Sequence, residues 1–154
     1  MLGIDPGSQR TGYGLIDSRG KQPAYIASGC INVTGQALPS RLREIYVGIC
    51  TLIDEHGPEC LAIEDVFVAQ NPRSALILGQ ARGVAIAAAV SRDLPVAEYA
   101  ARKVKQSIVG TGAADKAQIQ HMVQVLLGLS GRPQADAADA LAIALCHVNT
   151  ATLQ

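Results

Sequence analysis

Apolar residues in the N-terminal part of the chain fall in short stretches separated by turn residues. Residues 1–5 are apolar up to an acid and precede Pro6-Gly7-Ser8, a sequence typical of a turn. Residues 12–16 predict a second strand, and residues 25–33, rich in β-branched and aromatic side chains, predict a third. Three strands joined by short links indicate an antiparallel meander.

The pattern changes after Ser40, where apolar residues recur with the spacing of a helix that should end at Gly57-Pro58. Downstream, strands are expected at 61–66 and 96–99, and helices at 74–90, 116–127 and 135–148. Because strands and helices alternate here, the later strands should run parallel. The whole pattern predicts one α/β domain over residues 1–154, with a mixed five-stranded sheet and helices on both faces.

The composition is typical of a globular protein, since 49% of the residues are hydrophobic and 17% are charged. No run of 18 apolar residues predicts a membrane span, and Asp5 interrupts the stretch that a signal peptide would need. We therefore expect a cytoplasmic protein with no membrane partner. The four cysteines form no Cys-x-x-Cys motif, which favours reduced, buried thiols over a zinc site.

Four carboxylates occupy positions where charge is unexpected. Asp5 ends the first strand, Glu64 lies inside the apolar segment 61–67, and Asp136 and Asp139 share one face at the start of a helix. A buried isolated carboxylate is unfavourable, and four together would repel one another. A divalent cation removes this repulsion, and oxygen ligands suit Mg²⁺. Two such ions in one site are suited to phosphodiester hydrolysis.

Each acid also has an ordinary structural explanation. Asp5 could cap the turn that follows it, Asp136 could interact with the helix dipole, and Asp139 could be solvated. Glu64 has the fewest such explanations, because it lies between apolar residues in a strand. Strand alternation should point its neighbour Asp65 away from the metal face, so Asp65 is not counted as a ligand.

The net charge is zero, with 13 basic and 13 acidic residues, which does not by itself indicate a nucleic-acid partner. If the four proposed ligands are neutralised by metal, 13 − 4 = 9 acidic residues remain against 13 basic ones. A basic cluster around the glycine-rich loop 110–112 consists of Arg102, Lys103, Lys105 and Lys116. Such a cluster can bind phosphates, with a solvated loop and helix end as the alternative.

Six segments resemble, in the same order, those of the RuvC family of Holliday-junction resolvases, and the similarity extends over nearly the whole chain. The segments are Gly3-Ile4-Asp5-Pro6-Gly7-Ser8 with Thr11-Gly12-Tyr13-Gly14; Ile63-Glu64-Asp65-Val66-Phe67; Ala75-Leu76 with Leu78-Gly79-Gln80-Ala81-Arg82-Gly83; Val104-Lys105-Gln106; Gly110-Thr111-Gly112 with Asp115-Lys116; and Gln134-Ala135-Asp136-Ala137-Ala138-Asp139-Ala140-Leu141-Ala142.

This resemblance implies an RNase H-like fold and a homodimeric crossover junction endodeoxyribonuclease that makes matched nicks in four-way DNA junctions during recombination and repair. It also implies Mg²⁺, with Mn²⁺ as a substitute, and a branch-migration helicase complex of the RuvA–RuvB type as a partner. The positions that match the family's acidic metal site are Asp5, Glu64, Asp136 and Asp139. Lys105 and Lys116 match basic residues for DNA contact and catalysis, and Phe67 matches an aromatic that helps to open the junction.

The chain departs from the family at three places, one of which is the second acid, Asp65, beside Glu64. Met1-Leu2 is a shorter apolar start than members usually have, and Gln70 stands where lysine often precedes Asn71. Arg73 is expected to restore a positive charge nearby. The predicted DNA contacts are thus the two lysines and Phe67, together with Asn71, Arg73 and Arg102.

Small residues in the predicted helix 74–90 indicate a dimer contact, because they let two helices approach closely. Gly79, Gly83 and Ala87 are the residues expected at that contact, and a merely buried helix is the alternative. A two-fold dimer would suit a junction with pseudo-two-fold symmetry.

Two other functions remain open at this level. The first is an RNase H-like junction-binding protein without cleavage activity, which would not need four acids and two lysines. The second is an ATP-binding fold of the actin and sugar-kinase type, which also begins with Asp-x-Gly after a strand. Such proteins usually have two related domains in a much longer chain.

Overall fold

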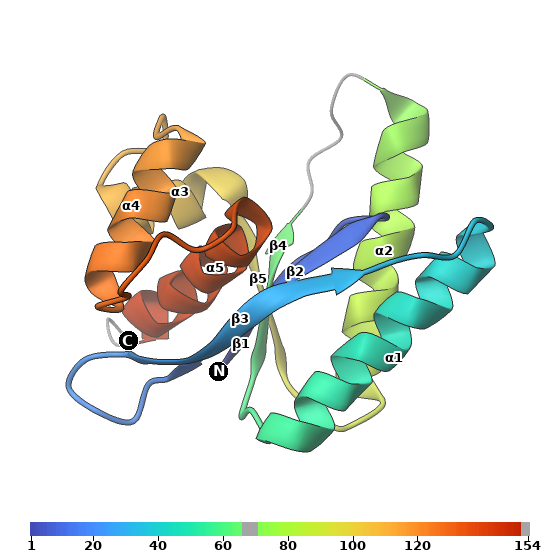
Figure 1. The fold of residues 1–154 in the computed structure, drawn as a ribbon, viewed down its shortest axis with the longest axis horizontal. Helices are drawn as coiled ribbons and strands as arrows, with labels where there is room; N and C mark the ends of the chain where they lie inside the picture. The colour runs from blue at the N-terminus through green and yellow to red at the C-terminus, as the bar shows by residue number, and fades with distance from the viewer. Residues whose placement is uncertain (66–70, 152–154) are drawn as a thin grey trace.

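In a computed structural model of the chain, residues 1–65 and 71–151 are described. Over these ranges the elements are, in chain order, β1 (Leu2–Asp5), β2 (Arg10–Asp17), β3 (Ala24–Asn32), α1 (Leu38–His56), β4 (Leu61–Asp65), α2 (Pro72–Val90), β5 (Val96–Ala100), α3 (Ala101–Val109), α4 (Lys116–Leu126) and α5 (Ala135–Ala151). The described strands form a five-stranded sheet in the order β3-β2-β1-β4-β5 (Figure 1). β1 pairs antiparallel with β2 and parallel with β4, so the predicted mixed sheet is confirmed.

The two faces of the sheet carry different layers of helices (Figure 1). α1 and α2 cover one face, and α3, α4 and α5 cover the other. Along β1, Leu2 and Ile4 are fully buried with the residues of α1 and α2, whereas Gly3 faces α5. Because side chains alternate along a strand, Asp5 also faces the α5 layer.

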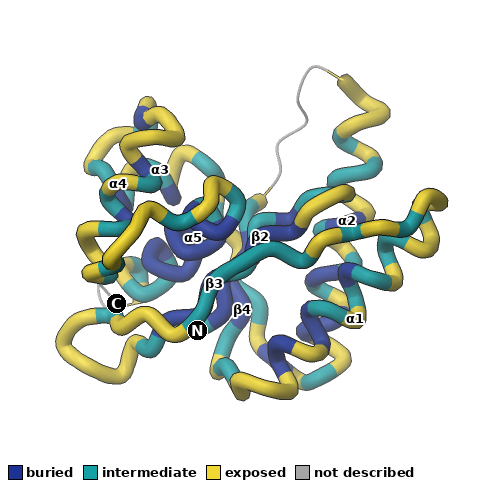
Figure 2. Tube along the Cα trace, in the orientation of Figure 1, coloured by how far each residue is buried: buried dark blue, intermediate teal, exposed yellow. Residues whose placement is uncertain are grey.

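α5 is the central helix of its layer and is buried over most of its length (Figure 2). Two glycines let it lie very close to the sheet. A Cβ atom at Gly3 would lie 2.1 Å from the carbonyl oxygen of Ala140, and one at Gly12 would lie 2.1 Å from that of Asp136. Any side chain at either position would therefore force α5 outward. This contact fixes where the first turns of α5 lie above the ends of β1 and β2.

The short first strand is held along both edges. The main chains of Met1 and Ile16 exchange two hydrogen bonds of 3.1 Å, and the Leu2 amide donates to the carbonyl of Cys60 at 3.0 Å. Leu2 and Ile4 are both fully buried. The shorter start therefore leaves the strand that carries Asp5 firmly paired.

Helix α3 is the element that the sequence pattern did not predict. It follows β5 without any connecting residue, and it buries only Val104 and Ile108. Arg102, Lys103 and Lys105 all lie on this helix, which ends where the loop 110–112 begins, and the Arg102 side chain packs beside Gly112 of that loop. A nine-residue helix with two buried positions gives too weak a periodic signal to detect in the sequence.

The cysteines are only partly as predicted. All four are free, and Cys50 and Cys146 are buried. Cys30 and Cys60 are partly exposed, so the expectation of burial is wrong for these two. Cys30 lies in β3, an edge strand of the sheet, and Cys60 lies just before β4.

Among the described residues, α2 alone is long and apolar enough to cross a membrane by length and composition. The sequence analysis predicted no membrane span, and this criterion is weak evidence against that prediction because core helices also meet it. Here α2 packs against the sheet and α1 through Ala81, Ala85, Ala88 and Ala89. Its outer side is exposed, as Leu76 illustrates at 70%.

Replacing Gly3 by alanine should lower the free energy of unfolding by about 1–3 kcal/mol, because the new Cβ atom collides with the α5 main chain. Urea unfolding followed by circular dichroism would measure the change. Gly131→Ala is the matched control, since nothing lies within 4 Å of a Cβ atom at Gly131. Equal stability of both variants and the wild type would show that α5 is free to shift.

Candidate active site

The ends of two neighbouring parallel strands place Asp5 beside Glu64. In the register of β1 and β4, Ile4 lies opposite Ile63, and the next residue on each strand is the acid. Both acids face the α5 layer, whereas Asp65 faces the other way and pairs with Arg82 of α2. The prediction that Asp65 points away from the acidic site is confirmed.

The first two turns of α5 bring further carboxylates over this strand edge. Asp136 lies in the first turn, where the missing side chain of Gly12 admits its main chain. Asp139 lies one turn later, and its Oδ2 atom is 3.4 Å from the Nζ atom of Lys116. The approach of α5 to the sheet thus gathers acids that are far apart in the sequence.

One cavity of about 260 Å³ collects most of the predicted site. Its lining residues are Asp5, Glu64, Ala101, Val104, Lys105, Lys116, Ile119, Asp139 and Ala142. Three carboxylates and two ammonium groups therefore share one partly apolar hollow. Asp136 does not line it, and its Oδ2 atom lies 3.9 Å from the sulfur of Cys30 instead.

Burial and like charge act together on the carboxylates. Burial, followed by the charges of Asp139, Glu64 and Asp136, raises the pKa of Asp5 to about 7. Burial and the charge of Asp139 also raise the pKa of Glu64, against the opposing effect of Lys105 and Lys116. Without a counter-ion, it is unfavourable near neutral pH for all of these carboxylates to be ionised at once.

The donor set fits a hard divalent cation, because it consists of carboxylate oxygens whose mutual repulsion such an ion would relieve. Within residues 1–65 and 71–151, however, no three His, Cys, Asp or Glu side chains already converge closely enough to ligate one ion. Asp5, Glu64 and Asp139 are spread along the cavity wall instead. A metal bound here would have to draw them inward.

The two lysines come from different helices. Lys105 lies on α3 and is half-buried, and Lys116 is the first residue of α4 with a largely exposed side chain. A capping box holds the start of α4: Asp115 accepts from the Gln118 amide, and the Gln118 side chain accepts from the Asp115 amide. Asp139, the nearest carboxylate, raises the pKa of Lys116, which therefore stays cationic.

The other predicted DNA contacts that the structure describes lie at the start of α2 and on α3. Asn71 caps α2, since its Oδ1 atom accepts from the amides of Arg73 and Ser74. Arg73 is exposed, and Arg102 on α3 lines a second cavity that also includes Asp5 and Glu64. Phe67 lies outside the described residues.

Arg82 is a residue near the site whose role the sequence analysis missed. Its Nε atom donates to the main-chain carbonyl of Glu64 at 3.0 Å, and its guanidinium also pairs with Asp65 and Glu98. Apart from Arg73 at its start, α2 contains no other charged residue. A lone charge among small and apolar residues was the signal that could have revealed it.

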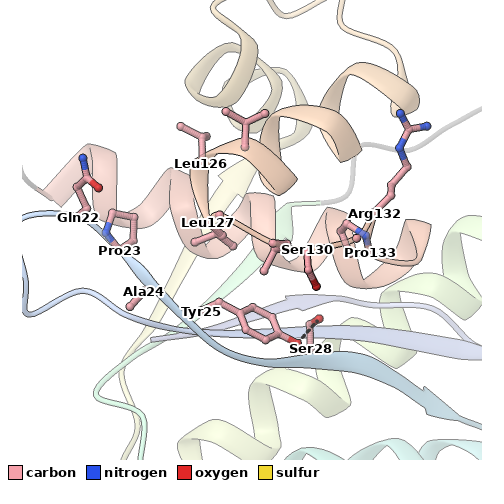
Figure 3. Close-up of a pocket in the computed structure, with 14 residues that line it drawn as sticks. Gln22, Pro23, Ala24, Tyr25, Ser28, Leu126, Leu127, Ser130, Arg132 and Pro133 are labelled. Carbon is pink, nitrogen blue, oxygen red and sulfur yellow. Dashed lines mark hydrogen bonds between the residues drawn. The ribbon is translucent and has the colours of Figure 1, made fainter.

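A larger cavity than the acidic one lies away from the acids. It measures about 1010 Å³ and separates the start of β3, at Ala24 and Tyr25, from the connection between α4 and α5 (Figure 3). Arg132 is its one charged lining residue in the described chain. Size therefore does not identify the reactive site here, and the concentration of perturbed carboxylates does.

In the metal-free protein, the raised pKa of Asp5 predicts that stability falls as pH rises from about 4 to about 7 and then levels off. The reason is that in this range the folded state binds a proton that the unfolded state has lost. Asp5→Asn should weaken this pH dependence, because Glu64 with its raised pKa remains, and should stabilise the metal-free protein at pH 8 by roughly 1–3 kcal/mol. Thermal unfolding in EDTA at pH 5 and pH 8 tests this, and an unchanged slope in the variant would contradict it.

Comparisons with known proteins agree with this geometry. The family model for Crossover junction endodeoxyribonuclease RuvC matches residues 1–147. A protein of that name from Serratia proteamaculans is 63% identical over 147 residues, which cover 96% of this chain and 85% of that protein. Another, from Pectobacterium carotovorum, is 60% identical over 156 residues, with 100% and 90% coverage.

A solved structure extends the similarity to the fold. The structure of Thermus thermophilus RuvC in complex with Holliday junction substrate matches with a TM-score of 0.92 and 31% identity, covering 99% of this chain and 94% of that one. The predicted RNase H-like fold is thereby confirmed. The similarity in sequence and the shared fold extend over nearly the whole chain, so the chain belongs to the RuvC family of crossover junction endodeoxyribonucleases.

Proposed function

We propose that this chain resolves four-way DNA junctions by metal-dependent hydrolysis of phosphodiester bonds, in homologous recombination and DNA repair. The observation that carries the proposal is the cavity in which Asp5, Glu64 and Asp139 meet two lysines. These acids come from two strands and a helix, and without a cation burial and their mutual repulsion disfavour the ionised form of Asp5 and Glu64. Membership of the family supports the same activity.

Nucleases of this family depend on a metal. We propose Mg²⁺, replaceable by Mn²⁺, held by Asp5, Glu64, Asp136 and Asp139. Asp136 is included because it lies one helical turn before Asp139 and its charge acts on Asp5. The four carboxylates and the ammonium groups of Lys105 and Lys116 leave a formal charge of −4 + 2 = −2. One divalent ion balances that charge, and an entering phosphate favours a second.

The chain's own residues would divide the remaining work. A bound divalent metal supplies an activated water and charge stabilisation for the departing oxygen. Lys105 and Lys116, on two sides of the cavity, would hold the scissile phosphate and stabilise the charge that develops on it. Arg102 and Arg73 would contact the flanking backbone, where positive charge sets affinity rather than sequence preference.

Asn71 and Phe67 are proposed to act at the junction centre. The Asn71 amide nitrogen remains available for DNA, since only its Oδ1 atom is used in the helix cap. An apolar ring at Phe67 could stack on an unpaired base. Family membership also supports a branch-migration helicase complex of the RuvA–RuvB type as a partner in the cytoplasm.

We also propose a homodimer through the outer side of α2. Gly79, Gly83 and Ala87 are exposed there in one stripe with Leu76 and Val90, and nothing lies within 4 Å of a Cβ atom at either glycine. Glycine within an exposed helix is destabilising by roughly 0.5–1 kcal/mol relative to alanine. Close approach of a second helix is a physical reason for two glycines to occur on this exposed side of α2. A two-fold pair would present two equivalent sites to opposed strands.

The cleavage test uses a labelled four-way junction with purified protein. With Mg²⁺ the wild type should make paired, opposed nicks, and with EDTA it should bind without cutting. Asp5→Asn and Glu64→Gln should lower the single-turnover rate by at least about 100-fold, more than loss of an outer partner of a metal ligand typically does. Junction binding should persist or tighten, because each variant removes negative charge.

Glu55→Gln is the matched control, since Glu55 is an exposed acid in the last turn of α1 and lines no cavity of the described site. It should cut at the wild-type rate. Tight binding by the wild type without any nick would favour the non-cleaving alternative. Unimpaired cutting by Asp5→Asn would show that the metal is held elsewhere.

Gly79→Leu tests the dimer. The space around Gly79 is open, so the variant should fold and gain a little helix stability, while the added side chain separates two facing helices. Light scattering should show a shift of the population from dimer toward monomer. Thr51→Leu, which enlarges an exposed residue on α1, should leave the mass unchanged. A full dimer in Gly79→Leu would place the contact on another surface.

A further inference from the structure

Arg82 crosses from α2 to the end of β4, on the opposite face of the sheet from the cavity. Its side chain is only 19% exposed, although its two carboxylate partners, Asp65 at 53% and Glu98 at 51%, lie near solvent. Its Nε atom donates to the Glu64 carbonyl oxygen at 3.0 Å. One guanidinium thus joins β4, the neighbouring β5 and α2.

The main chain at Glu64 needs such support. The register between β1 and β4 ends at Ile4 and Ile63, so Glu64 has a paired strand on one side only, where it lies opposite Tyr99 of β5. The Arg82 hydrogen bond fixes the orientation of the Glu64 peptide group. That orientation determines the direction in which the Glu64 side chain leaves the strand.

We infer that Arg82 is a positioning residue, which holds the end of β4 so that the Glu64 carboxylate enters the cavity in the direction that metal binding needs. The inference rests on the proposed function, because it assigns Glu64 to the metal site. Arg82 touches neither the cavity nor its carboxylates, and it acts only through the main chain of Glu64.

The chemistry of this position requires arginine. A planar guanidinium can donate to a carbonyl through Nε while its outer nitrogen faces two carboxylates, as it does here with Asp65 and Glu98. A lysine ammonium is a compact point charge and cannot span these three partners at once. Asp65, which follows Glu64, is therefore an ion-pair partner of Arg82 and not a metal ligand.

The position of Arg82 in α2 has a consequence for the dimer. Gly79 and Gly83, on the outer side of the same helix, are the residues proposed to contact a second copy. A shift of α2 on dimer formation would be transmitted by Arg82 to the strand that carries Glu64. The arginine therefore links the proposed dimer helix to the catalytic strand.

The test compares Arg82→Gln and Arg82→Lys with the wild type, by three measurements. The first is Mn²⁺ affinity without DNA, from the free Mn²⁺ signal in electron paramagnetic resonance. The second is hydrogen exchange of the metal-free peptide that contains Leu61–Asp65. The third is single-turnover cleavage of a four-way junction, beside its dissociation constant measured in EDTA.

Arg82→Gln should weaken Mn²⁺ binding and slow cleavage by about 10- to 100-fold, the range typical for loss of an outer partner of a metal ligand. Exchange at the end of β4 should become faster, while the junction dissociation constant should change by less than about threefold, because Arg82 faces away from the cavity. Arg82→Lys should recover only part of the loss. Asp65→Asn, which leaves the carbonyl contact intact, should have a smaller effect than Arg82→Gln.

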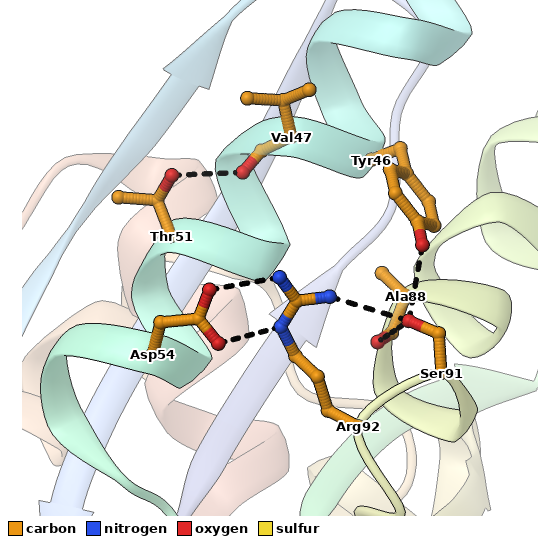
Figure 4. A network of polar contacts seen from close by, with 7 residues as sticks. All are labelled: Tyr46, Val47, Thr51, Asp54, Ala88, Ser91 and Arg92. Carbon is orange, nitrogen blue, oxygen red and sulfur yellow. Dashed lines mark hydrogen bonds and ion pairs between the residues drawn. The ribbon is translucent and has the colours of Figure 1, made fainter.

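Arg92 provides a matched control (Figure 4). Its guanidinium makes two contacts with Asp54, of 2.6 and 2.8 Å, and joins α1 to the turn after α2. Neither residue lines the cavity that holds Asp5, Glu64 and Asp139. Arg92→Gln should lower the melting temperature as Arg82→Gln does, because each loses an arginine–carboxylate pair. It should leave Mn²⁺ affinity and the cleavage rate unchanged.

The inference fails if Arg82→Gln binds Mn²⁺ and cuts like the wild type while only its melting temperature falls, which would make the residue purely structural. It also fails if Arg82→Lys restores both properties fully, since charge alone would then suffice. These results differ from failure of the proposed function, in which the wild type itself would not cut the junction.

Discussion

Carboxylates at the ends of β1 and β4 lie beneath a helix whose main chain packs directly against the sheet. Gly3 and Gly12 allow the main chain of α5 to lie against the sheet, and Asp139 is thereby brought over Asp5 and Glu64. Burial, followed by the like charges around it, raises the pKa of Asp5 to about 7, so the fold itself favours binding of a cation. The close packing of α5 on the sheet and the need for a cation therefore have the same origin.

The sheet separates two tasks. On the α5 face, the cavity gathers acids and lysines, which is the arrangement expected for phosphodiester chemistry in this family. On the other face, α2 presents small residues outward and sends Arg82 inward to the end of β4. A neutral chain can thus act on DNA, because three of its acids line a hollow where a cation would neutralise them, and Lys105 and Lys116 line the same hollow.

Much of this was available from the sequence because it follows from local pattern. The periodicity predicted the meander, the parallel strands and four of the five described helices, and alternation correctly turned Asp65 away from Glu64. Ordered motifs, such as the one around Asp5 and the one around Asp136 and Asp139, identified the family. What the pattern could not supply was α3, since nine residues with two buried positions carry little periodic signal.

The amino-acid sequence by itself determined which chemical groups the protein has, on which elements most of them lie and which way each strand turns them. Only the tertiary structure decided how near these groups come to one another. Asp136 lies outside the cavity beside Cys30. The Asn71 side-chain oxygen accepts a hydrogen bond in a helix cap, and Arg82 donates to the Glu64 carbonyl. The reason is physical. Local periodicity follows from backbone geometry, whereas contacts between distant segments depend on how closely whole layers pack.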